Sequence, residues 1–291
     1  VVKSYHKTPM LWGDVLIKNR DKVNLLPKDV IFIDWGYNKD YPFKEHASML
    51  KEKNINYLTA PGTSSWSTIT GRFMDMQETI ENSTTSAKKY NGLGAIITDW
   101  GDMGHLQYLP SSYLGFIYGA LLCWSKATLN DARIVLKDKL ADDKLEEVIV
   151  DLSTYHLLEG PYRDYGSRLF STIMWAEHAQ RQTDPKTFFL EKMQSNYIEK
   201  LKEAKDTLEK AEMKNAIDLL EALLAINDKL YSYSQSCIVS FDNEIKQLET
   251  YLNKHLELWC ARNKKEGYEF SANRIHWLIE MLMCLDRKER V

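Results

Sequence analysis

The chain has 291 residues, of which 44% are hydrophobic and 27% charged, a balance typical of globular proteins and unlike that of disordered ones. Its 38 basic and 41 acidic residues give a net charge of −3, so no basic excess exists to drive binding to nucleic-acid phosphates. No apolar run reaches the roughly 20 residues that a membrane-spanning helix needs. We therefore expect neither a nucleic-acid nor a membrane partner.

The cysteines give an expectation about the cellular compartment. Cys123, Cys237, Cys260 and Cys284 are scattered without the CxxC spacing of metal or redox sites. We expect free, mostly buried thiols, which favour a reducing, cytoplasmic location. No signal-peptide pattern opens the chain, which begins with Val1 instead of Met.

The first part of the chain alternates strand-like and helix-like segments. Apolar runs rich in Val, Ile, Leu and Tyr cover residues 10–16, 30–35, 56–60 and 95–100. Apolar side chains recur at helical spacing in two of the segments between them, 41–53 and 74–90. Such strand–helix units with short loops predict a parallel α/β sheet, and about four of them make half of a TIM-type (β/α)8 barrel. We predict this half barrel for residues 1–125.

The second part, residues 126–291, has the pattern of helices. Glycine is absent between positions 167 and 266, and apolar residues recur there every three or four positions. One apolar stripe predicts a long helix over 189–211, and a second predicts another over 238–259. An antiparallel helical hairpin or a small bundle fits this pattern.

A tryptophan stands close behind each predicted strand. Trp12, Trp35 and Trp100 are each followed by glycine, and Trp66 closes the turn-rich loop of residues 61–66. In a parallel α/β barrel the strand ends meet at the active-site mouth, so these indoles would converge on one pocket. Flat apolar rings suit the faces of sugars, or an aromatic or cationic ligand. The alternative is that the rings only fill the core.

Polar side chains accompany these indoles. Asp14 and Asp102 each follow a tryptophan by two positions, and strand alternation puts Asp102 on the side of Trp100. Both carboxylates are candidates to accept hydrogen bonds from ligand hydroxyls. Tyr37 would share the face of Trp35, and its hydroxyl would either donate to a ligand or pack beneath a loop.

Other chemistries find little support. Asp34 and Asp99, each directly before a tryptophan, are expected to brace loops. The chain has no GxGxxG or phosphate-binding lysine loop and no GxSxG nucleophile elbow. No second histidine at suitable spacing accompanies His105, so we predict no metal site and no cofactor.

The strand motifs carry a family resemblance. LWGD (11–14), VIFIDWGY (30–37), APGTSSW (60–66) and ITDWGD (97–102) resemble the last four strands of family 20 glycoside hydrolases, the β-N-acetylhexosaminidases. The resemblance is greatest to their bacterial, single-chain branch with a helical C-terminal region. Residues 256–271 resemble the C-terminal segment of that branch. The predicted strands therefore resemble strands five to eight of the catalytic barrel.

The resemblance implies substrate-assisted, retaining hydrolysis of terminal N-acetylglucosamine or N-acetylgalactosamine, an exception to the two-carboxylate scheme. In this family an adjacent Asp-Glu pair after strand four orients the acetamido group and protonates the leaving oxygen. The chain contains no Asp-Glu dipeptide. The resemblance thus implies that the catalytic pair lies before Val1, and we expect this chain alone to be inactive.

The resemblance also implies roles within the sugar pocket. The aromatic walls would come from Trp12, Trp100 and either Trp35 or Trp66. Asp102 would bind the outer sugar hydroxyls. Tyr37 would bond the acetamido oxygen, with Tyr57 as the alternative.

A half barrel leaves two edge strands, near residues 11–16 and 95–100, that need partners. We expect an N-terminal half of the barrel or a second copy of the chain to cover them; an isolated fragment would aggregate. A rival hypothesis is a non-catalytic carbohydrate-binding or assembly protein built on a half barrel. A third is a barrel enzyme that uses Asp14 and Asp102 as an acid–base pair, with carboxyls roughly 5–9.5 Å apart.

Overall fold

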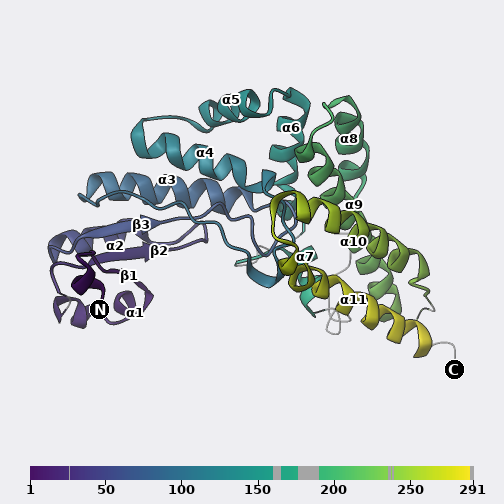
Figure 1. Ribbon diagram of the computed structural model, residues 1–291, viewed down its shortest axis with the longest axis horizontal. Helices are drawn as coiled ribbons and strands as arrows, with labels where there is room; N and C mark the ends of the chain where they lie inside the picture. The colour runs from purple at the N-terminus through teal and green to yellow at the C-terminus, as the bar shows by residue number, and fades with distance from the viewer. Residues whose placement is uncertain (26, 160–164, 176–189, 235–236, 238, 289–291) are drawn as a thin grey trace. The chain divides into compact units, whose positions relative to one another are not determined.

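The computed structural model describes residues 1–25, 27–159, 165–175, 190–234, 237 and 239–288 (Figure 1). The chain folds into two compact units, which alternate along the sequence. Unit 1 comprises Val1–Ser64, Phe73–Asp99 and Tyr113–Leu136, and unit 2 comprises Ser65–Arg72, Trp100–Ser112 and Lys137–Val291. Within the described residues, no helix combines the length and the apolar character needed to cross a membrane.

Unit 1 is built on a parallel sheet. Its three strands, β1 (Met10–Trp12), β2 (Ile31–Trp35) and β3 (Tyr57–Ala60), lie in the order β1-β2-β3. Isolated parallel bridges, Thr59 to Ala95 and Gly62 to Thr98, place the next segment beside β3. The predicted parallel pairing is confirmed for β1, β2 and β3, whereas residues 95–100, predicted as a fourth strand, form only isolated bridges. Closure into a (β/α)8 barrel stays a prediction.

The first strand is shorter than predicted. Residues 10–16 were expected to be extended, but β1 ends at Trp12 and helix α1 (Asp14–Lys18) follows. Gly13 explains the turn: a Cβ atom there would lie 2.3 Å from the Phe32 ring and 2.7 Å from a β2 carbonyl. The backbone approaches β2 so closely that only glycine fits, and the chain then turns away from the sheet.

Two crossover helices follow the strands, as the sequence predicts. They are α2 (Phe43–Glu52) and α3 (Phe73–Lys89), and Figure 1 shows α3 running along β3. The core cluster between sheet and helices consists of Val23, Phe32, Ala47, Leu50, Ile55 and Tyr57. Phe32 and Tyr57 come from adjacent strands and Ala47 and Leu50 from α2, so one face of the sheet is buried by α2. Helices α4 (Pro110–Trp124) and α5 (Leu129–Leu140) come next in the chain.

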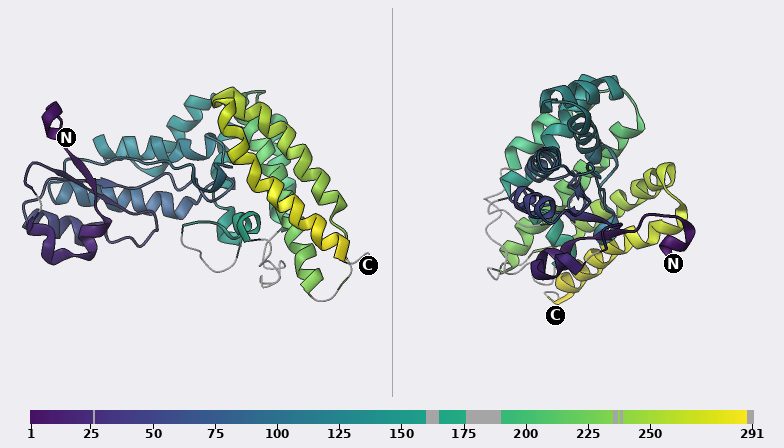
Figure 2. Two further views of the ribbon diagram at one scale, coloured as in Figure 1. Left: turned by 60° about the horizontal axis from the view of Figure 1, so that its bottom comes forward. Right: turned by 90° about the vertical axis from the view of Figure 1, so that its left-hand side faces the viewer.

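Unit 2 is helical in its described part. Its helices are α6 (Asp143–Leu152), α7 (Arg168–Trp175), α8 (Leu190–Glu203), α9 (Leu208–Ser234), α10 (Asp242–Arg262) and α11 (Tyr268–Lys288). Helices α9, α10 and α11 pack side by side (Figure 2). Arg262 of α10 links two of them: its Nε donates to Glu212 Oε1 of α9 at 2.5 Å.

Two sequence predictions need correction here. The single helix predicted over 189–211 is wrong, because α8 ends at Glu203 and α9 begins at Leu208; residue 189 lies outside the described residues. Thr207 caps the new helix, since its Oγ1 accepts a hydrogen bond from Lys210 N at 3.1 Å. The helix predicted over 238–259 is α10, which begins at Asp242; residue 238 also lies outside the described residues.

The cysteines are free but not mostly buried, so that prediction is wrong. Cys237, Cys260 and Cys284 are exposed, and Cys123 is partly buried. Burial raises the pKa of the Cys123 thiol. Cys260 and Cys284 lie on the outward faces of α10 and α11, where apolar periodicity does not require a hydrophobic residue.

The ion pair between α9 and α10 generates a stability prediction. Glu212 is 1% exposed, and burial raises its pKa although Arg262 lies beside it. Arg262→Met would leave the Glu212 carboxylate buried without its cation, so we expect unfolding free energy to fall by about 3 kcal/mol at pH 7. Urea denaturation measures the change. Lys202→Met, which breaks an exposed pair with Glu199, is the control and should cost under about 1 kcal/mol. Equal losses in the two variants would contradict this account.

Candidate functional site

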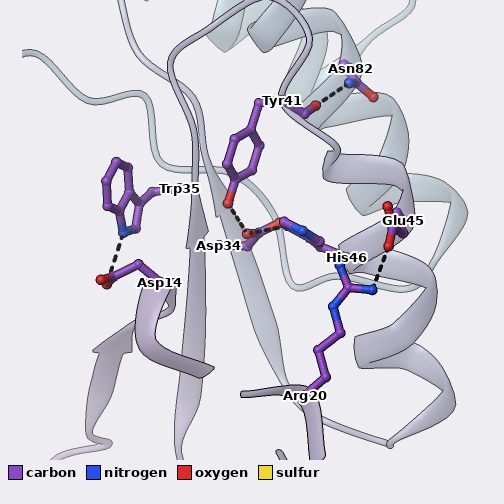
Figure 3. Close-up of polar contacts among 8 residues, drawn as sticks. All are labelled: Asp14, Arg20, Asp34, Trp35, Tyr41, Glu45, His46 and Asn82. Carbon is purple, nitrogen blue, oxygen red and sulfur yellow. Dashed lines mark hydrogen bonds and ion pairs between the residues drawn. The ribbon is translucent and has the colours of Figure 1, made fainter. Parts of the chain in front are cut away.

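Three of the residues predicted for the site lie together at the C-terminal ends of β1 and β2. Register pairs Trp12 with Ile33, which brings Asp14 level with Trp35 (Figure 3). The Trp35 Nε1 donates to Asp14 Oδ1 at 3.5 Å. The Trp35 and Tyr37 rings have centroids 5.3 Å apart and planes inclined by 31°. The strand ends therefore bring a carboxylate, an indole and a phenol into one cluster, which we call the strand-end cluster (Asp14, Trp35 and Tyr37).

Exposure differs among these rings. Trp35 is partly exposed, whereas Tyr37 is 6% exposed and covered beside it. Trp12 is 48% exposed on β1, which forms one edge of the described sheet. Trp12 and Trp35 therefore offer accessible ring surface in unit 1, and Tyr37 contributes mainly through its contact with Trp35.

A buried carboxylate holds the end of β2 from the opposite face. Asp34 is 1% exposed, and its Oδ1 accepts the Tyr41 hydroxyl at 2.9 Å and lies 3.1 Å from His46 Nδ1 of α2 (Figure 3). The Tyr41 carbonyl in turn accepts a hydrogen bond from Asn82 Nδ2 of α3 at 3.0 Å. The loop-bracing role expected for Asp34 is confirmed by these contacts. We call Asp34, Tyr41 and His46 the β2 brace.

The loop after β3 has a similar brace. The Thr63 hydroxyl donates to Asp99 Oδ1, so the motif PGTSSW is tied to the segment that pairs with β3. This contact confirms the bracing role expected for Asp99. Sequence reasoning found both aspartates, but it missed Tyr41 and His46. The signal for His46 was available, because it occupies the buried stripe of α2 with Phe43, Ala47 and Leu50.

The remaining predicted site residues belong to unit 2. Trp66 is 3% exposed, and the guanidinium carbon of Arg72 lies 5.9 Å from its ring centroid. Trp100 is 37% exposed, and its carbonyl accepts a hydrogen bond from Gln107 Nε2 at 2.7 Å. Asp102 is exposed. Because the seven residues are divided between the units, the convergence of all indoles and the pairing of Asp14 with Asp102 stay predictions.

The backbone after Trp100 departs from the expected strand. Asp102 opens a 3-10 turn, Asp102–Gly104, so strand alternation does not set the direction of its side chain. Met103, Gly104 and His105 have φ values of 57°, 101° and 53°. A left-handed residue other than glycine costs about 1–2 kcal/mol, so its surroundings must hold this segment in place.

Helices α10 and α11 supply those surroundings. A Cβ at Gly104 would lie 2.8 Å from Arg274 Cγ of α11, so the turn sits directly against that helix. The His105 and Trp259 rings meet edge to face, with centroids 6.0 Å apart. The contact requires the small residue at 104 and fixes the turn that carries Asp102.

A buried histidine lies beneath this turn. The Tyr108 hydroxyl lies 2.8 Å from His255 Nδ1, and Asn215 Nδ2 donates to the same hydroxyl oxygen at 2.7 Å. We assign the ring proton of neutral His255 to Nε2, so that Nδ1 accepts the Tyr108 proton. His255 Nε2 then carries the ring proton and donates to Ser271 Oγ at 3.0 Å. Burial, with a smaller contribution from His105, lowers the pKa of His255 to about 4.

Sequence reasoning missed this network because its members come from four separate segments. The one local signal is Tyr251, His255 and Trp259, which recur every four positions along α10 and line one side of it. In the part of the chain that the structure describes, no three His, Cys, Asp or Glu side chains gather as a metal site.

Gly36 allows the β2 brace to form, which generates a prediction. A Cβ there would lie 2.0 Å from Tyr41 Cγ, inside the ring. Gly36→Ala would force the ring away from Asp34, and we expect unfolding free energy to fall by about 2 kcal/mol in urea denaturation followed by tryptophan fluorescence. Ser48→Ala on α2 is the control and should change it by about 0.5 kcal/mol or less. Wild-type stability in Gly36→Ala would show that the ring is not held there.

The lowered pKa of His255 predicts acid destabilisation. The unfolded chain takes up a proton at this histidine near pH 6.5 and the folded chain only near pH 4. Below pH 6.5 the unfolded state thus binds more protons, and stability falls until about pH 4, by about 3 kcal/mol in total. Replacing the residue with glutamine should flatten this part of the pH–stability curve. His276→Gln, at an exposed position of α11, should keep the wild-type slope.

No known protein-family model matches the sequence, and no curated protein matches it either.

Proposed function

We propose that this chain is the substrate-binding, C-terminal half of a β-N-acetylhexosaminidase-like glycoside hydrolase. The complete barrel would act on terminal N-acetylglucosamine or N-acetylgalactosamine by substrate-assisted, retaining hydrolysis, with the catalytic Asp-Glu pair outside this chain. The observation that carries the proposal is the strand-end cluster, in which Trp35 lies 3.5 Å from the Asp14 carboxylate at the ends of two parallel strands.

The cluster has the chemistry of a sugar site. An indole face packs against the C–H face of a pyranose ring, and a neighbouring carboxylate accepts hydrogen bonds from its hydroxyls. The Asp14–Trp35 contact is at the long limit of a hydrogen bond, so it orients the carboxylate and leaves it able to accept stronger bonds from a ligand. The β2 brace supports this arrangement from behind, because it fixes Asp34, the residue before Trp35.

The outer strand β1 supports the idea of an incomplete barrel. Met10, Leu11 and Trp12 are 45%, 42% and 48% exposed, so apolar side chains on both faces of this strand meet solvent. An exposed apolar edge strand is a site for pairing with another strand. The proposal assigns this edge to the N-terminal half of the barrel, or to a second copy of the chain.

Sugar binding by the 291-residue chain tests the proposal. We expect N-acetylglucosamine to bind, and Trp35→Ala to weaken binding about tenfold because a stacking ring is lost. Isothermal titration with the free sugar measures the effect. Trp124→Ala is the matched control, since Trp124 is 92% exposed and outside the cluster. Equal affinities of the two variants would refute the assignment of Trp35.

Hydrolysis assays separate the two parts of the proposal. A chromogenic N-acetyl-β-glucosaminide or galactosaminide should not be turned over by this chain alone, because it lacks the Asp-Glu pair. Robust turnover would refute the missing-acid argument.

The absence of an Asp-Glu dipeptide also favours a second candidate, a non-catalytic carbohydrate-binding or assembly protein. The reading frame upstream of Val1 distinguishes the two candidates. An upstream segment with an Asp-Glu pair that restores turnover when added back favours the enzyme, and sugar binding with no such segment favours the binding protein.

A further inference from the structure

We propose that Tyr108 and His255 are positioning residues that anchor the segment of Trp100–His105 in the shape it needs to bind a ligand. For the identity of the ligand, an N-acetylhexosamine, the inference rests on the function proposed above. The anchoring itself is carried by contacts within unit 2.

The segment depends on neighbouring elements for its shape, and its middle is held at Gly104 and His105 by α11 and α10. Trp100 and Asp102 are exposed, and residues 103–105 are all left-handed, an arrangement that neither a strand nor a helix stabilises. Gln107 ties the Trp100 carbonyl to the far side of the turn, but Gln107 belongs to the same loop. The conformation thus depends on where the end of the loop is fixed.

Tyr108 is that fixed end. It is 6% exposed, and its hydroxyl is bonded to Asn215 of α9 and His255 of α10. His255 continues the chain of hydrogen bonds to Ser271 of α11. One phenol thus joins the loop to three helices that pack against one another.

The direction of the hydrogen bonds gives His255 a specific role, that of the acceptor for the Tyr108 hydroxyl. With the ring proton assigned to Nε2, Asn215 donates to Tyr108, Tyr108 donates to Nδ1 of His255, and Nε2 donates to Ser271. The ring also stacks on Tyr251, with centroids 5.3 Å apart and planes 13° from parallel. An aliphatic side chain could fill this space, but it could not accept the Tyr108 proton, and the hydroxyl would be left buried without an acceptor.

Paired substitutions separate positioning from simple packing. His255→Asn keeps an acceptor at the position of Nδ1, facing Tyr108, whereas His255→Gln keeps a polar group near Nε2, facing Ser271. Both remove the ring. Tyr108→Phe removes the hydroxyl, and Tyr233→Phe is its control, at a partly buried position of α9 outside the network.

Hydrogen exchange of the full chain, without ligand, is the deciding measurement. We expect amides of residues 100–107 to exchange at least tenfold faster in Tyr108→Phe and in the glutamine variant, while α10 and α11 change less than twofold. The asparagine variant should recover most of the protection, and Tyr233→Phe should match the parent. Unchanged exchange at 100–107 in Tyr108→Phe, or equal exchange in the asparagine and glutamine variants, would overturn the proposal.

Titration with N-acetylglucosamine then tests the ligand. Tyr108→Phe should weaken binding at least fivefold, and the asparagine variant should bind more tightly than the glutamine variant. If the parent chain binds no N-acetylhexosamine while the exchange pattern is as expected, the function proposed above is wrong and the anchor stands. If the parent binds sugar and Tyr108→Phe binds equally well, the positioning role is wrong.

Discussion

The site in unit 1 depends on one buried carboxylate. Asp34 points away from the strand-end cluster, toward α2. Its Oδ1 accepts a hydrogen bond from the Tyr41 hydroxyl and also lies within hydrogen-bond distance of His46 Nδ1. A carboxylate without partners in this position would be strongly destabilising, so strand, loop and helix must keep their relative places for the fold to persist. Trp35 follows Asp34 directly on β2, so the contacts of Asp34 also help to hold the backbone that carries the Trp35 ring (Figure 3).

Unit 2 meets the same need in another way. The turn that carries Asp102 is strained, and its stability comes from neutral hydrogen bonds among a phenol, an amide, an imidazole and a hydroxyl. In unit 1 the anchor is instead the buried carboxyl group of Asp34, which lies against Tyr41 and His46.

Helices and strands that follow from local apolar periodicity were predictable from the sequence. Element ends that depend on contacts between separate segments were not. Apolar runs and helical spacing identified β2, β3, α2 and α3, because each buries one continuous face. The early end of β1 depends on how near Gly13 lies to Phe32, which no periodicity reveals. The break between α8 and α9 coincides with the helix cap at Thr207. The apolar spacing continues across this break, so periodicity alone predicts one helix. Asp14, Trp35 and Tyr37 were found because strand ends are recognisable, while Tyr108 acts through Asn215 and His255, which are distant in sequence.

The direction of the strands limits what can complete the sheet. Every described pairing in unit 1 is parallel, and β1 forms one edge of the described sheet. A strand arriving in the same sense would extend the ring and keep all strand ends at a single rim. A strand paired antiparallel to β1 would place its N-terminal end at that rim, so the loop before it, and not the loop after it, would lie there. The proposed barrel therefore requires a partner strand that runs parallel to β1, as strand–helix units supply.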